Sequence, residues 1–252
     1  MIPIDISDKT ALVTGATGEL GRVIARTLAR AGADIAVHYH VNSEQADLLV
    51  SDIEEIGSKA AAVRGDITDR TSVSRMKTAV QKELGPPDIL VTNAVIQYDW
   101  KTILDQAPED YESQFRSSVL HNVLTAQAFL PAMIEKGWGR VIGINTECSM
   151  QYWKNQSAYI AGKRGMDGVL RVLAREVGEH SVTVNQVAPG WTVSENRPET
   201  DSTQWYRERV PLKRRGTDQD IAHTVAFLAS DLAGFITGAF IPVCGGNIMP
   251  AI

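Results

Sequence analysis

The hydrophobic period of the chain changes repeatedly along its length. Residues 10–14 form a short apolar run, and beyond it Leu20, Val23, Ile24 and Leu28 recur at intervals of one, three and four. Short apolar runs are typical of buried strands, whereas spacing of three and four is typical of one helix face. The same alternation continues to the C-terminus. It predicts strands over residues 10–14, 34–38, 61–64, 88–92, 140–145, 182–187 and 239–243.

Cap and turn residues set the expected limits of the helices. Ser43 and Asp69 are expected N-caps, because their side chains can accept from the first free N–H groups of a helix. Thr217 or Asp218 is expected to cap the last helix, and Pro131 predicts a bend near the end of a long one. The expected helices cover residues 20–31, 43–56, 69–84, 108–137, 157–178 and 217–230.

The order of these elements predicts the fold class. Strands that read as continuous Val, Ile and Leu runs, each followed by a helix, indicate a parallel sheet covered on both faces. Right-handed crossovers then give an α/β, Rossmann-like doubly wound sheet. We expect residues 1–252 to form one domain, with the charged irregular stretch at about 191–215 as a lid over a site.

Composition excludes several classes of protein. The net charge is −5 and there is no basic stripe, which argues against nucleic acid as a partner. No apolar run is long enough to span a membrane, and the first strand begins too early for a signal peptide. We therefore expect a cytoplasmic protein. Cys148 and Cys244 are expected to be buried free thiols, and no histidine cluster indicates a metal.

Tyr159 and Lys163 are the most informative pair in the chain. They lie four residues apart in the expected helix 157–178, so their side chains share one helix face. A neighbouring ammonium favours the phenolate and lowers a tyrosine pKa from about 10 toward the working pH. The hydroxyl of Thr146, at an expected strand end, is placed to orient a carbonyl or alcohol oxygen. The pair also occurs on exposed helix faces, so this interpretation requires a hydride carrier.

A glycine-rich turn follows the first expected strand, Thr14-Gly-Ala-Thr-Gly-Glu-Leu-Gly21. Such a turn lets backbone N–H groups approach a pyrophosphate at the positive end of a helix, although it can also serve only tight packing. Glu19 follows Gly18 directly. Its carboxylate suits the helix dipole but repels a bound pyrophosphate unless it points to solvent.

Over nearly its whole length the chain resembles the single-domain branch of the short-chain dehydrogenase/reductase family, which includes 3-oxoacyl-carrier-protein reductases. The resemblance rests on motifs in the family's order and spacing. They are the turn 14–21, Gly65-Asp66-Ile67-Thr68, Thr92-Asn93-Ala94, the set Thr146, Tyr159 and Lys163, the segment 184–190, and Ile236-Thr237-Gly238 with Gly245-Gly246. It implies an oxidoreductase that interconverts a carbonyl and an alcohol by hydride transfer with NAD(P)(H).

The resemblance also implies roles for single residues. Tyr159 is the general acid or base, Lys163 lowers its pKa and binds the nicotinamide ribose, and Thr146 binds the substrate oxygen. Ser118 stands where the family has an asparagine that holds a water beside the lysine, and Asn122 replaces it only if the helix kinks or shifts. The implied cofactor contacts are Gly15, Thr17, Gly18, Glu19, Leu20, Tyr39, His40, Asp66, Ile67, Asn93, Ala94, Tyr159, Lys163, Pro189, Gly190, Thr192 and Ser194.

The residues after the second strand bear on which dinucleotide is used. An acidic residue there favours NAD, but Tyr39 and His40 occupy the position. No carboxylate is present to reject a 2′-phosphate, and no arginine is present there to bind one. We expect NADP(H), with NAD(H) as the alternative.

The expected partner is a small carbonyl or alcohol compound, held between Tyr159, residues 95–100, residues 147–153 and the lid. Aromatic residues on these loops indicate an apolar or ring-bearing substrate, or else lid packing or a subunit contact. The resemblance implies a homo-oligomer, a dimer or tetramer, and no nucleic acid or membrane partner. An alternative function is a dinucleotide-binding protein with little or no turnover, which Ser118, Glu19 and Val95 motivate because they depart from the family pattern.

Overall fold

The computed structural model describes residues 4–196 and 203–249, so residues 197–202 of the expected lid lie outside the described part. Seven parallel strands form one sheet in the order β3-β2-β1-β4-β5-β6-β7. This confirms the predicted doubly wound α/β sheet. The strands are β1 (Thr10–Val13), β2 (Asp34–Tyr39), β3 (Ala60–Arg64), β4 (Ile89–Thr92), β5 (Gly139–Ile144), β6 (Val182–Pro189) and β7 (Phe240–Val243).

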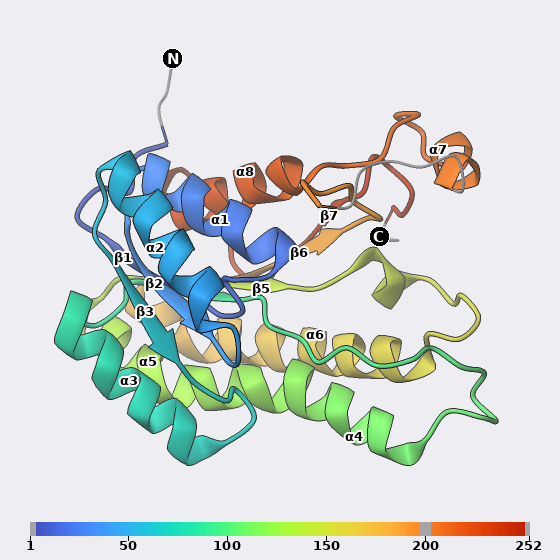
Figure 1. The fold of residues 1–252 in the computed structure, drawn as a ribbon, viewed down its shortest axis with the longest axis horizontal. Coiled ribbons are helices and arrows are strands. Elements are labelled where there is room, and N and C mark those ends of the chain that lie inside the picture. Colours follow the sequence, from blue (N-terminus) through green and yellow to red (C-terminus); the bar gives the residue numbers. More distant parts are fainter. Residues whose placement is uncertain (1–3, 197–202, 250–252) are drawn as a thin grey trace.

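Helices cover both faces of the sheet (Figure 1). One layer holds α1 (Glu19–Arg30), α2 (Ser43–Ile56) and α8 (Asp218–Ala229). The other holds α3 (Arg70–Leu84), α4 (Pro108–Phe115), α5 (His121–Lys136) and α6 (Ser157–Val177), while α7 (Gln204–Arg209) lies beyond the end of the sheet. No helix among the described residues is long and apolar enough to cross a membrane.

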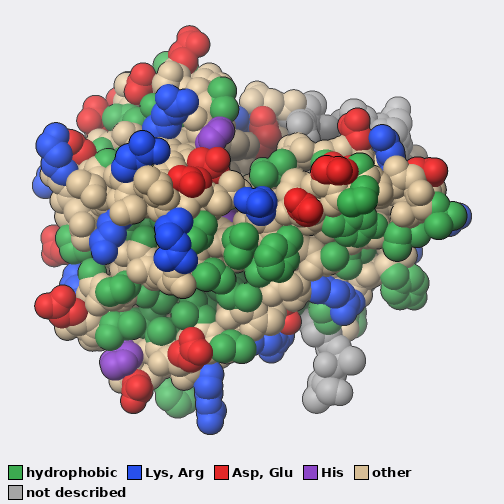
Figure 2. Space-filling model, turned by 90° about the horizontal axis from the view of Figure 1, so that it is seen from below, with side chains coloured by type: hydrophobic (Ala, Val, Ile, Leu, Met, Phe, Trp, Pro, Cys, Tyr) green, Lys and Arg blue, Asp and Glu red, His purple; other side chains and the backbone are tan. Residues whose placement is uncertain are grey.

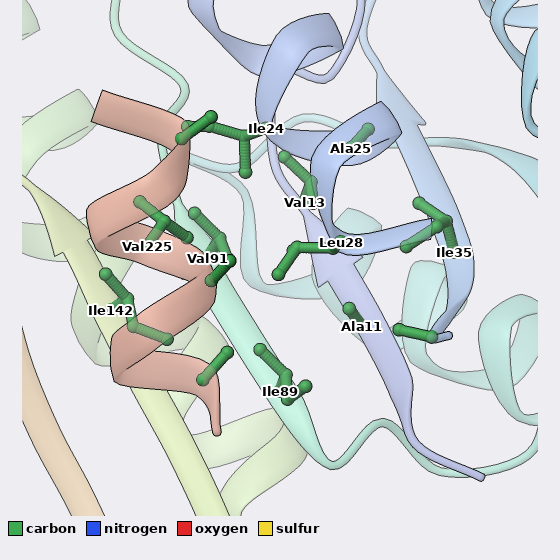
Figure 3. Packing of buried hydrophobic residues seen from close by; sticks show 14 of the residues in the cluster. Ala11, Val13, Ile24, Ala25, Leu28, Ile35, Ile89, Val91, Ile142 and Val225 are labelled. Atoms are coloured by element: carbon green, nitrogen blue, oxygen red, sulfur yellow. The ribbon is translucent and has the colours of Figure 1, made fainter. Parts of the chain in front are cut away.

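The core is formed where β1 lies between β2 and β4. Ala11 and Val13 face Leu28 of α1 and are completely buried, as Figure 3 shows. The intervening Leu12 belongs to the apolar cluster on the opposite face. Because side chains alternate along a strand, both faces of β1 are apolar, and this is why the run reads as continuous in the sequence. Burial of each such aliphatic side chain contributes roughly 1.5–3 kcal/mol.

The helix caps follow the sequence predictions with one shift. Asp69 caps α3 by accepting from the N–H of Ser72 at 2.6 Å, and Thr217 caps α8, both as expected. The prediction for α2 is wrong by one residue. Asn42 is its N-cap, because the Asn42 side chain accepts from the N–H of Gln45 at 3.1 Å and Ser43 is already helical.

The long helix expected over residues 108–137 is interrupted, but upstream of Pro131. A single wide π turn, η1 (Arg116–Leu120), separates α4 from α5, and α5 continues through Pro131. Just after this turn the Asn122 amide donates to the Ser118 carbonyl at 2.6 Å and accepts from the Thr92 hydroxyl at 2.7 Å. Side-chain bonds to the helix backbone and to β4 thus accompany the irregular turn.

Two glycines let α6 pack closely against this interrupted helix. A Cβ on Gly162 would lie 2.7 Å from the Gln114 carbonyl oxygen, and one on Gly165 would lie 2.8 Å from a Val119 methyl. Lys163 lies between them in the sequence. The close approach of α6 to α4 and η1 therefore depends on the absence of side chains on either side of this lysine.

This packing gives a stability prediction within one helix. We expect Gly162→Ala to lower the free energy of unfolding by about 1–3 kcal/mol, because the added methyl overlaps backbone. Gly168→Ala is the matched control, since a Cβ there meets nothing within 4 Å. It should stabilise the protein by about 0.5–1 kcal/mol, the usual gain of alanine over glycine in a helix. Urea unfolding of both variants checks this, and equal effects would contradict it.

Candidate active site

The predicted catalytic residues meet beyond the carboxyl end of β5. Thr146 is buried and follows that strand, and its hydroxyl is a hydrogen-bond partner of the Tyr159 phenol. The Lys163 ammonium donates to the Ile144 carbonyl at 2.6 Å and lies 5.9 Å from the centre of the Tyr159 ring. The structure therefore brings the three residues together, as their spacing in the sequence predicted.

Two aromatic residues from the loop after β4 hold Tyr159 in place. The Tyr98 hydroxyl accepts from the Tyr159 backbone N–H at 2.8 Å. The Trp100 ring stacks on the Tyr159 ring, with centroids 6.0 Å apart and planes inclined by 26°. The loop around residues 95–100 thus contacts the tyrosine directly, and one face of its ring is covered.

The protonation of this pair differs from the expectation. Burial raises the pKa of Tyr159 above its ordinary value, and the hydrogen bond with Thr146 lowers it by less. Burial also lowers the pKa of Lys163 to about 8. The expected net lowering of the Tyr159 pKa is not found in this arrangement, because loss of hydration raises the pKa while the ammonium is bonded to Ile144. A phenol kept protonated is suited to act as an acid.

Ser118 is buried beside this group, but its hydroxyl has no hydrogen-bond partner among the described residues. The helix irregularity that Asn122 requires is present at η1, yet the Asn122 amide is engaged by Thr92 and the Ser118 carbonyl. His121, which the sequence reasoning did not consider, is also buried, and burial lowers its pKa to about 3. Near Lys163 the helix thus carries an uncharged polar face.

The glycine-rich turn is held rigidly by its neighbours. The Gly15 N–H donates to His38 at 2.9 Å, and the Asn93 amide donates to the carbonyls of Thr14 and Gly15. Gly15 has a positive φ of 61°, which favours glycine, and a Cβ on Gly21 would lie 2.2 Å from the Gly15 carbonyl oxygen. Both glycines are therefore required by the turn itself.

Gly18 is different, and it supplies a test of whether a dinucleotide fits. Its φ of −77° suits any residue, and a Cβ there would meet only the Gly15 carbonyl oxygen, at an ordinary 3.4 Å. Gly18 is also the N-cap of α1 and provides no side chain to the first N–H groups of that helix. A turn with exposed, uncapped N–H groups and no side chain in front of them fits a bound diphosphate.

Glu19 is turned toward its own helix and the lid. Its carboxylate pairs with Arg22 at 2.5 Å and accepts from the Asn196 amide at 3.2 Å. Burial alone would raise the pKa of Glu19, but the groups of Ser194, Asn196 and Arg22 outweigh it and lower the pKa. The Arg22 guanidinium, one residue past the glycine-rich turn, is shared by Glu19 and Glu195.

Asp218 is a second acidic residue near Glu19 and the glycine-rich turn. Asp218, the first residue of α8, is buried, and burial together with the nearby Glu19 raises its pKa to about 6. A bound diphosphate would therefore meet both positive helix N–H groups and acidic side chains here.

The ends of β2 and β3 bring together the residues expected at the adenosine. Tyr39 is paired in register with Arg64, whose guanidinium donates to the His40 carbonyl at 3.2 Å. The end of β2 itself carries no arginine, but the parallel pairing of β2 with β3 places both strand ends side by side and so brings Arg64 next to it. Asp66 accepts from the N–H and hydroxyl of Thr68.

The remaining predicted contacts line the same edge of the sheet. Ala94 lies against Gly15, Ile67 is buried, and Gly190 follows Pro189 at the end of β6. The Thr192 carbonyl accepts from Arg215. The half-buried members of the set are Thr17, Leu20 and Ser194. Among the described residues no group of three histidine, cysteine or acidic side chains could hold a metal.

Comparison with known proteins agrees with this geometry. The family model described as enoyl-(acyl carrier protein) reductase matches residues 15–247. The chain belongs to the short-chain dehydrogenase/reductase family. It is 36% identical to nodulation protein G of Azospirillum brasilense over 244 residues, which covers 96% of this chain and 98% of that protein. It is 35% identical to the 3-oxoacyl-acyl-carrier-protein reductase FabG of Staphylococcus epidermidis, covering 96% and 100%.

Solved structures of the family are also similar. A blue fluorescent protein from a metagenomic library, determined in complex with NADPH, superposes with a TM-score of 0.90 at 32% identity. The match covers 97% of this chain and 100% of that one. Members of this family are oxidoreductases.

The acidic side chains of Glu19 and Asp218 near the glycine-rich turn give a prediction about cofactor binding. We expect Glu19→Gln to tighten binding of NADPH by about three- to tenfold, because it removes a like charge near the diphosphate. The matched control is Glu54→Gln, which lies in the last turn of α2, at the opposite end of that helix from His40. Titration followed by nicotinamide fluorescence measures both. Unchanged or weaker binding in the Glu19 variant would show that its charge does not oppose the cofactor.

Proposed function

We propose that the protein is an NADP(H)-dependent carbonyl reductase or alcohol dehydrogenase. The observation that carries the proposal is the meeting of three side chains at the end of β5. The Tyr159 phenol, the Thr146 hydroxyl and the Lys163 ammonium lie together; Thr146 and Lys163 are buried and Tyr159 is half-buried.

Each side chain has a definite task in reduction. A bound nicotinamide supplies or receives the hydride. Tyr159 donates its proton to the oxygen that becomes the alcohol, as a general acid. Thr146 orients that oxygen, because its hydroxyl can both donate and accept. Lys163 is charged below about pH 8 and stabilises the phenolate that remains.

The proposed preference for NADP(H) rests on charge at the adenosine end. Tyr39 and His40 bring no carboxylate against a 2′-phosphate, and the Arg64 guanidinium lies beside the His40 carbonyl. Arginine binds phosphate through several N–H groups in one plane. The NADPH complex of the metagenomic blue fluorescent protein supports the same choice.

Aromatic side chains favour a ring-bearing carbonyl substrate. Trp100 stacks on Tyr159, and Trp153, Trp191 and Trp205 of α7 are each more than one third exposed. Part of this surface also serves lid packing, since Trp205 contacts both Trp153 and Trp191 at centroid distances below 6 Å. The two uses are compatible, because partly exposed indoles can pack on one side and bind a ring on the other.

We propose that the chain assembles through the face covered by α4, α5 and α6. Figure 2 shows hydrophobic side chains gathered across this side of the molecule. Phe115 of α4 is 51% exposed and Val172 of α6 is 58% exposed. Large apolar side chains exposed on neighbouring helices are typical of a subunit contact. The cytoplasmic location and the choice between dimer and tetramer stay predictions from the sequence.

A substrate panel tests the proposed reaction. We expect oxidation of NADPH in the presence of at least one aromatic ketone or 3-oxo-thioester, followed as loss of nicotinamide absorbance. Tyr159→Phe keeps the ring and its contact with Trp100 but removes the proton donor, so activity should fall by about 100-fold or more. Cofactor binding in that variant should stay within about threefold of the wild type.

The same assay decides between the two functions that the sequence left open. If NADPH binds but no substrate gives oxidation that depends on Tyr159, the chain is a dinucleotide-binding protein with little turnover. The unpartnered Ser118 hydroxyl, together with Glu19 and Asp218 near the glycine-rich turn, would then explain the low turnover.

A second prediction concerns the cofactor. We expect NADPH to bind at least about tenfold tighter than NADH, and Arg64→Ala to remove most of that preference, because a single guanidinium–phosphate contact has about this strength. Arg30→Ala, at the far end of α1, is the control. An unchanged preference in the Arg64 variant would sink the assignment of this arginine, and a preference for NADH would sink the choice of NADP(H).

A further inference from the structure

Glu147, the residue after Thr146, is buried and joins three distant parts of the chain. One carboxylate oxygen accepts from the Tyr206 hydroxyl of α7 at 2.8 Å. The other accepts from the Asn247 side-chain amide, beyond β7, at 2.9 Å. Glu147 itself begins η2 (Glu147–Met150) and is only 3% exposed. A single carboxylate thus holds the lid helix and the C-terminal segment to the turn that follows β5.

The proton positions in this group are fixed by its hydrogen bonds. The Tyr206 hydroxyl also accepts from the backbone N–H of Trp191 at 2.8 Å, so the one proton of that hydroxyl points to Glu147. Both contacts of the carboxylate are made to neutral donors. Burial raises the pKa of Glu147, and the bonds from Asn247 and Tyr206 oppose that rise. Arg209 and the Trp191 backbone N–H also favour the charged form of Glu147, by less than Asn247 and Tyr206 do.

The surrounding backbone seats the lid closely at this point. A Cβ on Gly190 would lie 2.5 Å from the Tyr206 hydroxyl, and one on Gly245 would lie 2.6 Å from a Val210 methyl. The N–H of Leu212 donates to the Gly245 carbonyl at 3.2 Å. The segment that follows α7 therefore lies directly on the turn after β7.

The position of Tyr206 also fixes three indole side chains, which we call the aromatic wall: Trp153, Trp191 and Trp205. Its ring contacts Trp191 and Trp205 edge-on, with centroids 5.7 and 5.8 Å away. Trp205 in turn contacts Trp153, which lies on the loop that leads to α6. A shift of Tyr206 therefore moves the indoles that face the substrate.

We propose that Glu147 is a positioning residue that holds helix α7, the described helical part of the lid, over the candidate active site. Its carboxylate fastens Tyr206 of α7 and Asn247 of the C-terminal segment beside Thr146, and so keeps the aromatic wall over the candidate active site. The effect on turnover rests on the proposed function, whereas the effect on the lid does not. Removal of the carboxylate leaves the buried Tyr206 hydroxyl and the half-buried Asn247 amide without this acceptor, which favours displacement of α7.

Hydrogen exchange of the α7 amides tests the lid directly. We expect Glu147→Ala and Tyr206→Phe to speed exchange of residues 204–210 by about tenfold or more, because local opening exposes these amides. Glu147→Gln should stay within about threefold of the wild type. The amide oxygen of the new glutamine side chain still accepts from Tyr206. Its NH₂ group can donate to the side-chain oxygen Oδ1 of Asn247, which is buried and unpartnered, once the Asn247 amide turns over.

Asp88→Asn is the matched control for loss of a buried carboxylate. Asp88 lies just before β4, at the amino end of the strands, where it accepts from the Thr10 N–H and the Lys136 ammonium. This variant should lower the free energy of unfolding without selective exchange in residues 204–210. Normal exchange of α7 in Glu147→Ala, or equal exchange in the alanine and glutamine variants, overturns the proposal.

Steady-state kinetics with a substrate found in the panel supplies the second readout. We expect Glu147→Ala to raise KM by about tenfold while kcat changes by less than about threefold, the pattern of lost binding rather than lost chemistry. Glu147→Gln should restore KM. A fall in kcat with unchanged KM would instead place Glu147 in the chemical step and overturn the positioning role. If the panel yields no substrate, the exchange experiment still decides about the lid.

Discussion

Lys163 carries a charge that the fold removes from water, and the geometry of the site follows from how that charge is accommodated. Desolvation of an ammonium is costly unless it is hydrogen-bonded. Here it donates to the Ile144 carbonyl at the end of β5, which ties α6 to the sheet. The close approach through Gly162 and Gly165 is what buries the lysine. The same loss of water raises the pKa of Tyr159 and lowers that of Lys163 to about 8. Burial therefore leaves a protonated phenol beside a cation that is charged at neutral pH, which is the state a proton donor needs.

At the glycine-rich turn, by contrast, the charged side chains form ion pairs with one another. Glu19 and Glu195 lie near the glycine-rich turn and share Arg22, and Glu195 also pairs with Arg26. These ion pairs are partly exposed, so salt and water weaken them. Because Glu195 belongs to the lid and both arginines belong to α1, the pairs also fasten the lid to the helix that begins at the glycine-rich turn. An anion that competes for Arg22 would thus act on the lid as well.

How far the sequence predicts this molecule depends on the range of the interactions involved. The sheet and the set Thr146, Tyr159 and Lys163 were predictable, because strand periodicity and the spacing of four on a helix are local properties. The position of Arg64 was not, since it depends on the register between β2 and β3. The π turn depends on contacts of Asn122 with β4, and its place in the helix could not be derived from Pro131. The buried state of Glu147 depends on residues 59 and 100 positions away.

The polar character of the Glu147 contact bears on how a lid can both close and open. An apolar seal would expose hydrophobic surface each time it opened, at a cost that grows with area. A carboxylate with two donors exposes little apolar surface, because Glu147, Tyr206 and Asn247 can each bond to water once separated. The closed position is nevertheless specific, since an acceptor must meet both donors at once and the Tyr206 hydroxyl lies where a Cβ on residue 190 would be. A buried polar contact seated on glycine backbone therefore gives a lid one defined closed position, while most of its energy is recovered as hydration when it opens.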